Sequence, residues 1–325
     1  MTMQDLRRRR LLQGLGAAGL MTAGGPLFAQ GRPMTVLVGA ASSMDFTARL
    51  LADELRQSLD KPVIAVSKLG AGGRVALAEL KRSAPDGETI MLSTSSAFVV
   101  YPNIYERLDY DPVKDFTPII NVAWFDVSIA VGPDMPVNSL GELSEWIKKQ
   151  PGEVVYGCAP GTGSSSHFAG IAFEVATGAR LKPIPYKDSG QGIADTIGGR
   201  IPIMITGTTP LAAQHNAGKI KLLATSGPKR SPMVSGVPTM KESGIDVEIT
   251  INCSLYGPAG MDPATVARLH DAADAILNRP AVRDRLTKQG MSVDPFDGKR
   301  LGDVLHAERD RYAQLARAAG MTKIQ

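Results

Sequence analysis

The feature that most constrains the fold is the alternation, from Thr35 onward, of short β-branched runs with amphipathic helical runs. Such alternation predicts an α/β fold in which a parallel sheet is covered by helices. In the first third of the chain we expect strands at 35–38, 63–66 and 89–92, and helices at 46–59 and 75–83. A second series predicts helices at 140–149, 168–176, 193–197 and 211–217, and strands at 154–156, 181–185, 201–205 and 220–224.

The length and order of these segments favour two lobes. The 325 residues exceed the usual single domain of roughly 100 to 200 residues. Two apolar runs, 119–123 and 127–131, precede the second series, and we interpret the latter as a crossing between lobes. The extended run 247–254 leads into three helical segments, 263–277, 281–289 and 301–319, with no further strand expected. Such a tail should return to the first lobe. We therefore assign 30–127 plus 254–325 to lobe 1 and 128–253 to lobe 2, with a ligand cleft between them.

The first 29 residues are typical of an export signal rather than of the fold. Arg7 to Arg10 precede the apolar stretch 11–23, and the segment ends at Ala29, where we expect cleavage. The run 8–13 resembles a twin-arginine signal, with an ordinary secretory leader as the alternative. Losing four Arg and one Asp lowers the net charge from +4 to about +1, so the positive balance is poor support for nucleic-acid binding. We expect a monomeric mature protein in the periplasm.

The cysteines and most histidines give no sign of a cofactor. Cys158 and Cys253 match no metal-binding spacing. Export permits a disulfide between them, but two buried free thiols are the favoured interpretation. His215, His270 and His306 lie on predicted helices without the spacing of a metal site. We therefore expect neither a metal nor another cofactor.

Loops that follow strands are the candidate binding elements, because ligands of open parallel sheets lie beyond the strands' carboxyl ends, against helix N-termini. Four such loops, 39–45, 70–74, 93–97 and 160–167, are rich in small and polar residues, and free amides that open a helix favour an anion. The alternative for the first loop is a plain helix cap, and for the second a simple turn. The second loop lacks the spacing of nucleotide-binding motifs. The candidate ligand-binding residues of these loops are Ala40, Ala41, Ser42, Asp45, Arg74, Ser95, Thr162, Gly163, Ser164, Ser165 and His167.

The loop 160–167 is the strongest of the four, because glycines, hydroxyls and a helix start occur together there. The serines at 164–166 beside His167 also permit a serine hydrolase as an alternative. A catalytic serine needs a base oriented by an acid, typically on a G-x-S-x-G elbow, and that elbow is absent. We therefore expect His167 to support the loop.

A set of collinear motifs identifies a family. They are DxxARL from Asp45, GAGG at 70–73, APDG at 84–87, YDPVKDFTP at 110–118, PGTGSSSH at 160–167, PYK at 185–187, AGK at 217–219, KRSP at 229–232, VPT at 237–239 and GPAG at 257–260. In this order, from about Met34 to the C-terminus, they resemble the periplasmic receptors of tripartite tricarboxylate transporters, the Bug family. The resemblance implies a two-lobed periplasmic-binding-protein fold of type II without catalytic activity. It also implies a small carboxylate, held partly through water by the first and fourth loops and passed to membrane permease subunits. A ligand-presenting subunit for an envelope sensor kinase is the alternative that keeps this fold.

Several positions depart from the family's pattern. The first loop reads GAASSMD where the family usually has PAGGSTD, so added side chains narrow the approach to the backbone. Arg74 stands where Asn often follows GAGG; it either pairs with a second carboxylate or points to solvent. Thr206 replaces a frequent Asp, which disfavours an amino-acid ligand and adds Thr206 to the candidate site. Trp124 and Phe125 either line the cleft for an aromatic or apolar ligand tail or belong to the core.

Overall fold

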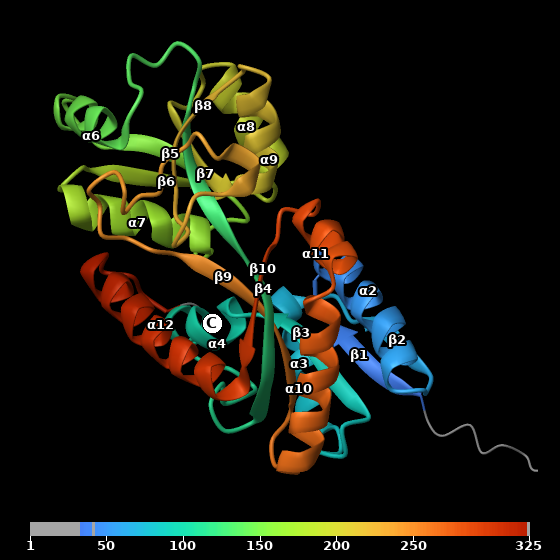
Figure 1. Ribbon diagram of the computed structural model, residues 1–325. Coiled ribbons are helices and arrows are strands. Elements are labelled where there is room, and N and C mark those ends of the chain that lie inside the picture. The colour runs from blue at the N-terminus through green and yellow to red at the C-terminus, as the bar shows by residue number, and fades with distance from the viewer. Residues whose placement is uncertain (1–32, 41–42, 324–325) are drawn as a thin grey trace, which may run out of the picture. The chain divides into compact units, whose positions relative to one another are not determined.

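A single 16-residue strand, β4 (Phe116–Val131), runs through both halves of the fold (Figure 1). From Phe116 to Asp126 it pairs antiparallel with β9 (Thr250–Pro258). From Val127 to Val131 it pairs with β7 (Ile203–Gly207) and β8 (Lys221–Thr225) instead. The chain therefore changes sheets between positions 126 and 127. The two apolar runs expected at 119–123 and 127–131 are one strand, because residues 124–126 stay extended against residues 250–252 of β9.

The computed structural model describes residues 33–40 and 43–323. The proposed export signal and its cleavage site at Ala29 lie outside these residues. From Pro33 onward the chain forms one compact unit.

The first sheet has the order β2-β1-β3-β9-β4, with β10 also on β4. Its strands β1 (Met34–Val38), β2 (Val63–Ser67) and β3 (Thr89–Thr94) are parallel. Strands β9 and β10 (Ser292–Asp297) run antiparallel to their neighbours. The expectation of a purely parallel sheet is therefore wrong here, and so is that of a C-terminal tail without a strand. β10 escapes a sequence pattern because it contains two Asp and Pro295, and it is built by pairing with β4 around a bulge.

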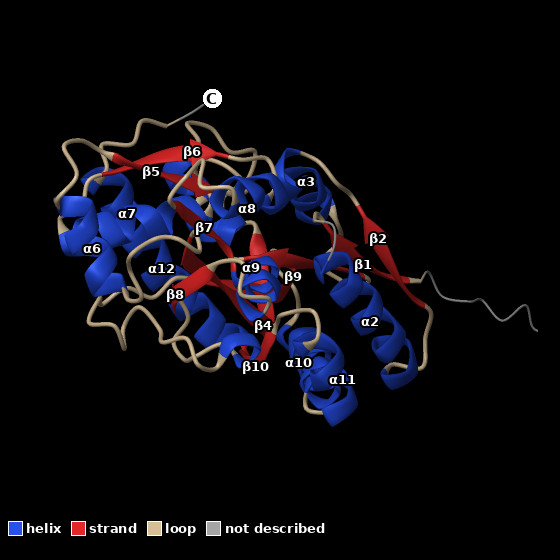
Figure 2. Cartoon of the chain, turned by 90° about the horizontal axis from the view of Figure 1, so that it is seen from above, coloured by secondary structure: helices blue, strands red, loops and turns tan. Residues whose placement is uncertain are grey.

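Helices cover both faces of this sheet. They are α2 (Ser43–Ser58), α3 (Arg74–Arg82), α4 (Ser96–Val99), α5 (Tyr101–Ile104), α10 (Pro263–Leu277), α11 (Pro280–Thr287) and α12 (Gly298–Ala318), with a 3-10 turn η1 (Ala71–Gly73) before α3. Figure 2 shows α2, α10 and α11 together on one side, where they bury Leu51, Leu55 and Ile276. The amphipathic spacing of these apolar residues is what the sequence pattern detected.

The second sheet has the order β4-β7-β5-β6, with β8 also on β4, and its strands β5 (Val154–Cys158) and β6 (Leu181–Pro185) are parallel. Its helices are α6 (Leu140–Lys148), α7 (Ser165–Thr177), α8 (Ser189–Ile197) and α9 (Thr208–Asn216). These elements follow the predicted strand and helix series closely, so the α/β class is confirmed.

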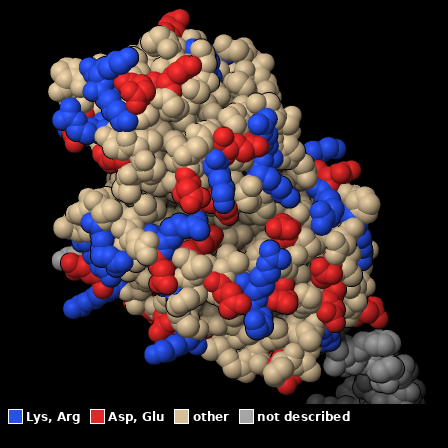
Figure 3. All heavy atoms as spheres, turned by 60° about the vertical axis from the view of Figure 1, so that its left-hand side comes forward, with Lys and Arg blue, Asp and Glu red and all other residues tan. Residues whose placement is uncertain are grey.

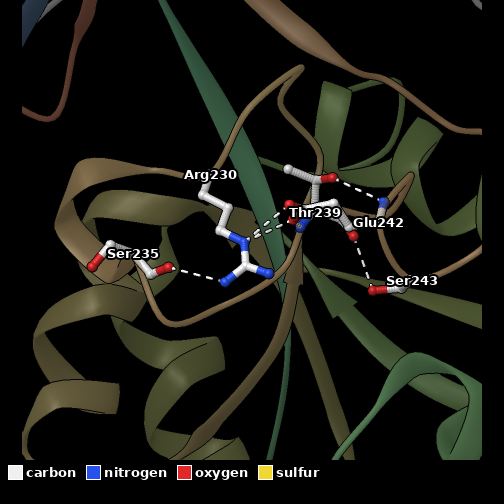
Figure 4. A network of polar contacts seen from close by, with 5 residues as sticks. All are labelled: Arg230, Ser235, Thr239, Glu242 and Ser243. Carbon is white, nitrogen blue, oxygen red and sulfur yellow. Dashed lines mark hydrogen bonds and ion pairs between the residues drawn. The ribbon is translucent and has the colours of Figure 1, made fainter.

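A long segment, 226–249, returns from β8 toward β9 with only the short turn η2 (Pro232–Val234). Figure 4 shows what fixes it. The Arg230 Nε donates to the Glu242 carboxylate at 2.9 Å. Glu242 and Thr239 also cap each other: the Thr239 amide donates to Glu242 Oε2 at 2.8 Å, and the Glu242 amide donates to Thr239 Oγ1 at 3.1 Å. This capping box orders a segment that has little regular structure.

The two crossing strands are joined where they pass between the sheets. Ser226 Oγ accepts from the Val127 amide at 3.1 Å and donates to the Ile249 carbonyl. Helix α12 lies beside the same crossing and reaches α7 of the second sheet, where the rings of Tyr312 and Phe168 meet edge to face at 4.8 Å. The crossing is thus a well-connected region rather than a loose linker.

Candidate functional site

The main cavity, of about 790 Å³, lies at the ends of strands from both sheets. Four groups of residues line it. The first sheet contributes Gly39, Ala40, Ser43, Gly72, Thr94, Ser96, Tyr101, Ile104 and Tyr105, and the turn 289–291 lies beside them. The crossing strands contribute Phe125, Val127 and Ile251. The second sheet contributes 159–160, 162–166, 188–189, 206–207 and 209–210. A cavity of this size accommodates a small organic ligand.

The start of α7 is the best-formed anion site in this cavity. Ser164 is its N-cap, and its Oγ accepts from the His167 amide at 3.2 Å. The amides of Ser165 and Ser166 occupy the first two helical positions, which have no acceptor within the helix. Both residues line the cavity, so these N–H groups and the positive end of the helix dipole are suited to an anion there.

His167 supports this loop from behind. Its Nδ1 accepts from the Gly163 amide at 3.1 Å, which places the ring proton on Nε2, and burial lowers the pKa of the imidazole. The three neighbouring serines are otherwise engaged: Ser166 donates to the Ala159 carbonyl, Ser164 caps the helix, and Ser165 faces Tyr312. The described residues thus provide no serine hydroxyl bonded to the ring as a nucleophile needs. The supporting role expected of His167 fits this geometry better than the hydrolase alternative.

Other helix starts reach the same cavity. α2 begins at Ser43, beside Gly39 and Ala40 of the loop after β1. α9 begins after Gly207, where no side chain caps the helix, and Thr209 in its first turn lines the cavity. α8 differs, because the Asp188 carboxylate already accepts from the Gly190 amide at 2.8 Å. Helices from both sheets therefore present amides to one space.

Another part of the lining is aromatic and apolar. Tyr101 and Tyr105 meet edge to face with ring centroids 5.4 Å apart, and the Tyr101 hydroxyl donates to the Gly72 carbonyl at 2.9 Å. Phe125 lies in this part of the lining, whereas its neighbour Trp124 is buried at 3% exposure beside Gly227. Of the two aromatics that sequence left open, one lines the cavity and the other belongs to the core.

The predicted site residues divide into three groups. Ala40, Thr162, Gly163, Ser164, Ser165 and Thr206 line the cavity. Asp45, Arg74, Ser95 and His167 lie outside its lining. Ala41 and Ser42 fall outside the described residues.

The residues outside the lining have defined partners. Asp45 accepts from the Arg49 Nε at 2.8 Å and from the Ser67 hydroxyl, and the bond to Arg49 holds the pKa of this carboxyl below its usual range. Ser95 is buried, and its Oγ accepts from the Asn252 amide at 3.1 Å. The Arg74 guanidinium lies 4.4 Å from the centre of the Tyr105 ring. Each therefore fixes an element beside the cavity rather than facing into it.

Sequence reasoning missed several lining residues. Tyr101 begins a four-residue helix that gives no amphipathic signal, and Tyr105 follows that helix directly. The turn at Gly290 follows α11 and is distant in sequence from the loops that follow strands. In space it approaches α9 so closely that a Cβ at Gly290 would lie 1.9 Å from Thr209 Oγ1. A search of post-strand loops could have found two of the missed signals: Asp188 and Ser189 after β6, and Gly207 and Thr209 at the end of β7.

The cavity lining carries few charged side chains. It contains no Lys, Arg or His, and Asp188 is its one acidic residue. On the molecular face in Figure 3, acidic and basic side chains are interspersed rather than gathered by sign. Any anion selectivity of this cavity must therefore come from amides and hydroxyls.

The thiols and carboxylates of the described residues form no second centre. Both cysteines are free and buried, which confirms the favoured interpretation, and burial raises the pKa of the Cys158 thiol to about 11. No group of three or more His, Cys, Asp or Glu is arranged to hold a metal ion in this part of the chain. No helix of residues 33–40 and 43–323 is both long and apolar enough to cross a bilayer.

Comparison with known proteins identifies the family of this chain. It matches the family model described as tripartite tricarboxylate transporter family receptor over residues 47–321. It is 34% identical over 289 residues to the UPF0065 protein in the gbd 5′ region of Cupriavidus necator, covering 88% of this chain and 83% of that protein. Among solved structures, R. palustris Rpa4515 with adipate is similar with a TM-score of 0.76 and 26% identity, covering 90% of this chain and 99% of that one. MatC from Rhodopseudomonas palustris with bound malate is similar with a TM-score of 0.70 and 25% identity, covering 90% of this chain and 99% of that one.

The chain therefore belongs to the family of tripartite tricarboxylate transporter receptors, which are solute-binding proteins and not enzymes. The predicted family and its two-sheet receptor fold are confirmed.

Proposed function

We propose that this protein captures a small organic carboxylate in the main cavity and delivers it to the membrane subunits of a tripartite tricarboxylate-type transporter. The observation that carries the proposal is the convergence of helix starts from both sheets, α2, α7 and α9, on one cavity that has no cationic side chain. Backbone amides at helix starts hold a carboxylate without a counter-ion. Two similar receptors are described with the dicarboxylates adipate and malate.

The residues proposed to contact the ligand are those of the predicted set that line the cavity, with the Ser165 and Ser166 amides as principal donors. Ala41 and Ser42 belong to the same loop as Ala40 and remain proposed contacts. Asp45, Ser95 and His167 are proposed to act by positioning the elements on which these contacts lie.

The mobility proposed for capture follows from the shared strand. The proposed lobes, 30–127 plus 254–325 and 128–253, are hinged where β4 changes sheets and where the chain returns through β9. Closing the lobes would desolvate the carboxylate between amides of both and so strengthen each hydrogen bond. The proposal also includes export to the periplasm, cleavage near Ala29 and a monomeric mature protein.

The proposal is tested at one backbone group. Proline at position 165 suits the first helical position, because Ser164 already has the extended φ of −81° and ψ of 164° that precede proline well. The substitution removes the amide hydrogen together with the serine hydroxyl. Ser165→Pro is compared with Ser165→Ala, which loses the same hydroxyl but keeps the amide. Calorimetry with a carboxylate panel should show Ser165→Pro binding about 10 to 100 times more weakly than Ser165→Ala, the effect of one charge-assisted hydrogen bond.

Equal affinities of the two variants, or no binding of any carboxylate by the unaltered protein, would contradict the proposal. The transporter role is tested separately: deleting the gene should abolish uptake of the labelled ligand. Loss of a transcriptional response with uptake intact would instead indicate a sensory subunit.

A further inference from the structure

We infer that the ligand of this receptor is a monocarboxylate with an aromatic body, which lies against Tyr101 and Tyr105, and that Arg74 positions Tyr105 instead of binding a second carboxylate. This inference rests on the proposed carboxylate-binding function and narrows it to one ligand class.

The charge of the cavity lining argues against a second carboxylate. The starts of α2, α7 and α9 are all assigned to the one carboxylate of the proposed function. The apolar part of the lining consists of Tyr101, Ile104, Tyr105 and Phe125, where Ile104 lies against Gly163 of the α7 loop, and this part has no cation. A second carboxylate enclosed there would lose its hydration without an opposite charge, which is costly. The one charged side chain in the lining, Asp188, would repel it.

The position of Tyr101 is fixed by its loop. Its hydroxyl donates to the Gly72 carbonyl at 2.9 Å, and the approach depends on glycine, because a Cβ at Gly72 would lie 2.4 Å from that hydroxyl oxygen. Gly72 also has a φ of +65°, which other residues adopt rarely. A ring held in this way provides a flat wall at little entropic cost on binding.

The position of Tyr105 is fixed by two neighbours. Tyr101 meets it edge to face, at an interplanar angle of 85°. The Arg74 guanidinium lies over its ring at 4.4 Å, and the Arg74 Nε donates to the Ala71 carbonyl at 3.1 Å. Arg74 is thus engaged by its own loop and by the ring. A cation on a ring at an exposed site makes only a weak contact, enough to orient Tyr105 but not to neutralise a ligand.

The test pairs ligands that differ in one property. Benzoate, phenylacetate and 3-phenylpropanoate are each compared with their cyclohexyl analogues, and hexanoate with adipate, by calorimetry on the full mature protein. At least one aromatic acid should bind about tenfold more tightly than its cyclohexyl analogue, the gain expected of a good ring contact. Adipate should bind no more tightly than hexanoate.

Matched variants assign the effect to residues. Tyr105→Leu should weaken binding of the aromatic acid about tenfold while changing the affinity for its cyclohexyl analogue little. Tyr105→Phe, which keeps the ring, should bind the aromatic acid as the unaltered protein does. Arg74→Gln should weaken hexanoate and adipate equally. Melting curves of each variant exclude a folding defect.

Two outcomes overturn the inference and leave the proposed function standing: adipate binds more tightly than hexanoate, or the aromatic acids gain nothing over their cyclohexyl analogues. Loss of the adipate advantage in Arg74→Gln would assign the second carboxylate to Arg74. If no carboxylate binds and Ser165→Pro behaves as Ser165→Ala, the proposed function itself fails.

Discussion

Glu308 on α12 is a buried acid beside the crossing strand, and its removal should change how stability depends on pH. The residue is 8% exposed. Its Oε1 accepts from Thr250 Oγ1 and from Asn252 Nδ2, both at 3.2 Å, whereas Oε2 has no partner among the described residues. Burial raises the pKa of this carboxyl from 4.5 to about 7, against the lowering effects of the Thr250 bond and of Arg311.

The direction of the pH effect on stability follows from which protonation state of Glu308 the folded protein prefers. A raised pKa means that the carboxyl group binds its proton more tightly in the folded state than in the unfolded state. At pH below about 4.5 the acid is neutral in both states and carries no penalty. As the pH rises through 4.5 toward 7, the unfolded state ionises first and folding stability is lost, by about 3 kcal/mol in total. Carboxyls with lowered pKa, such as Asp45, act in the opposite direction, so only a difference between variants isolates Glu308.

Glu308→Gln keeps an oxygen acceptor for Thr250 and Asn252 but cannot ionise. Urea unfolding at pH 5 and pH 8 should show its stability relative to the unaltered protein rising by about 2 to 3 kcal/mol between the two values. Glu106→Gln, a change at an exposed glutamate, is the control and should show no such rise. A stability difference for Glu308→Gln that is the same at both pH values would refute the assignment of a buried, high-pKa acid at this position.

Three other changes test the local geometry. Ser164→Ala should lower the free energy of unfolding by about 1 kcal/mol through loss of the α7 cap; if Ser164→Thr, which keeps the hydroxyl, loses as much, the cap is not the cause. Gly163→Ala should lower both Tm and ligand affinity, because its Cβ would lie 2.7 Å from Ile104 Cδ1 at a φ of +79°. Gly199→Ala, at a φ of +69° but in open space, should lower Tm alone, and equal loss of affinity in both would argue against the contact. The two buried cysteines should resist a thiol reagent in the native protein and both react in urea, so fast native labelling would contradict their burial.

The sequence predicted elements well wherever the signal is local. α2 and α10 bury one apolar stripe each, and β1 and β3 are short apolar runs, so periodicity alone locates them. The failures depend on distant partners. β10 is a strand because β4 offers it an edge, and the direction of β9 is set by its partners β3 and β4. Neither fact is present in a local pattern.

The residues of the candidate site also divide into those with a local sequence signal and those whose role depends on distant partners. The loop 160–167 was identified because a helix start after a strand has a local signature in glycine and serine. Tyr105 was not, because its importance arises from Gly72, Arg74 and Tyr101 brought beside it by folding. Family motifs indicated the loop at the start of α7, whereas the aromatic part of the cavity lining became visible only in three dimensions.

The first loop shows why a departure in sequence need not disrupt such a site. Its two usual glycines are absent, and Gly39 stands where the family usually has Pro; a Cβ at Gly39 would lie 2.6 Å from the Gly73 Cα of the GAGG loop. In this chain the loops after β1 and β2 therefore meet backbone to backbone at this pair, at a spacing that leaves no room for a side chain at position 39. Because the grip on the carboxylate is proposed to use amides, it depends on how closely these backbones lie and on where helices begin. The side chains of the aromatic and apolar part of the lining are then free to differ, and we propose that they select the carboxylate.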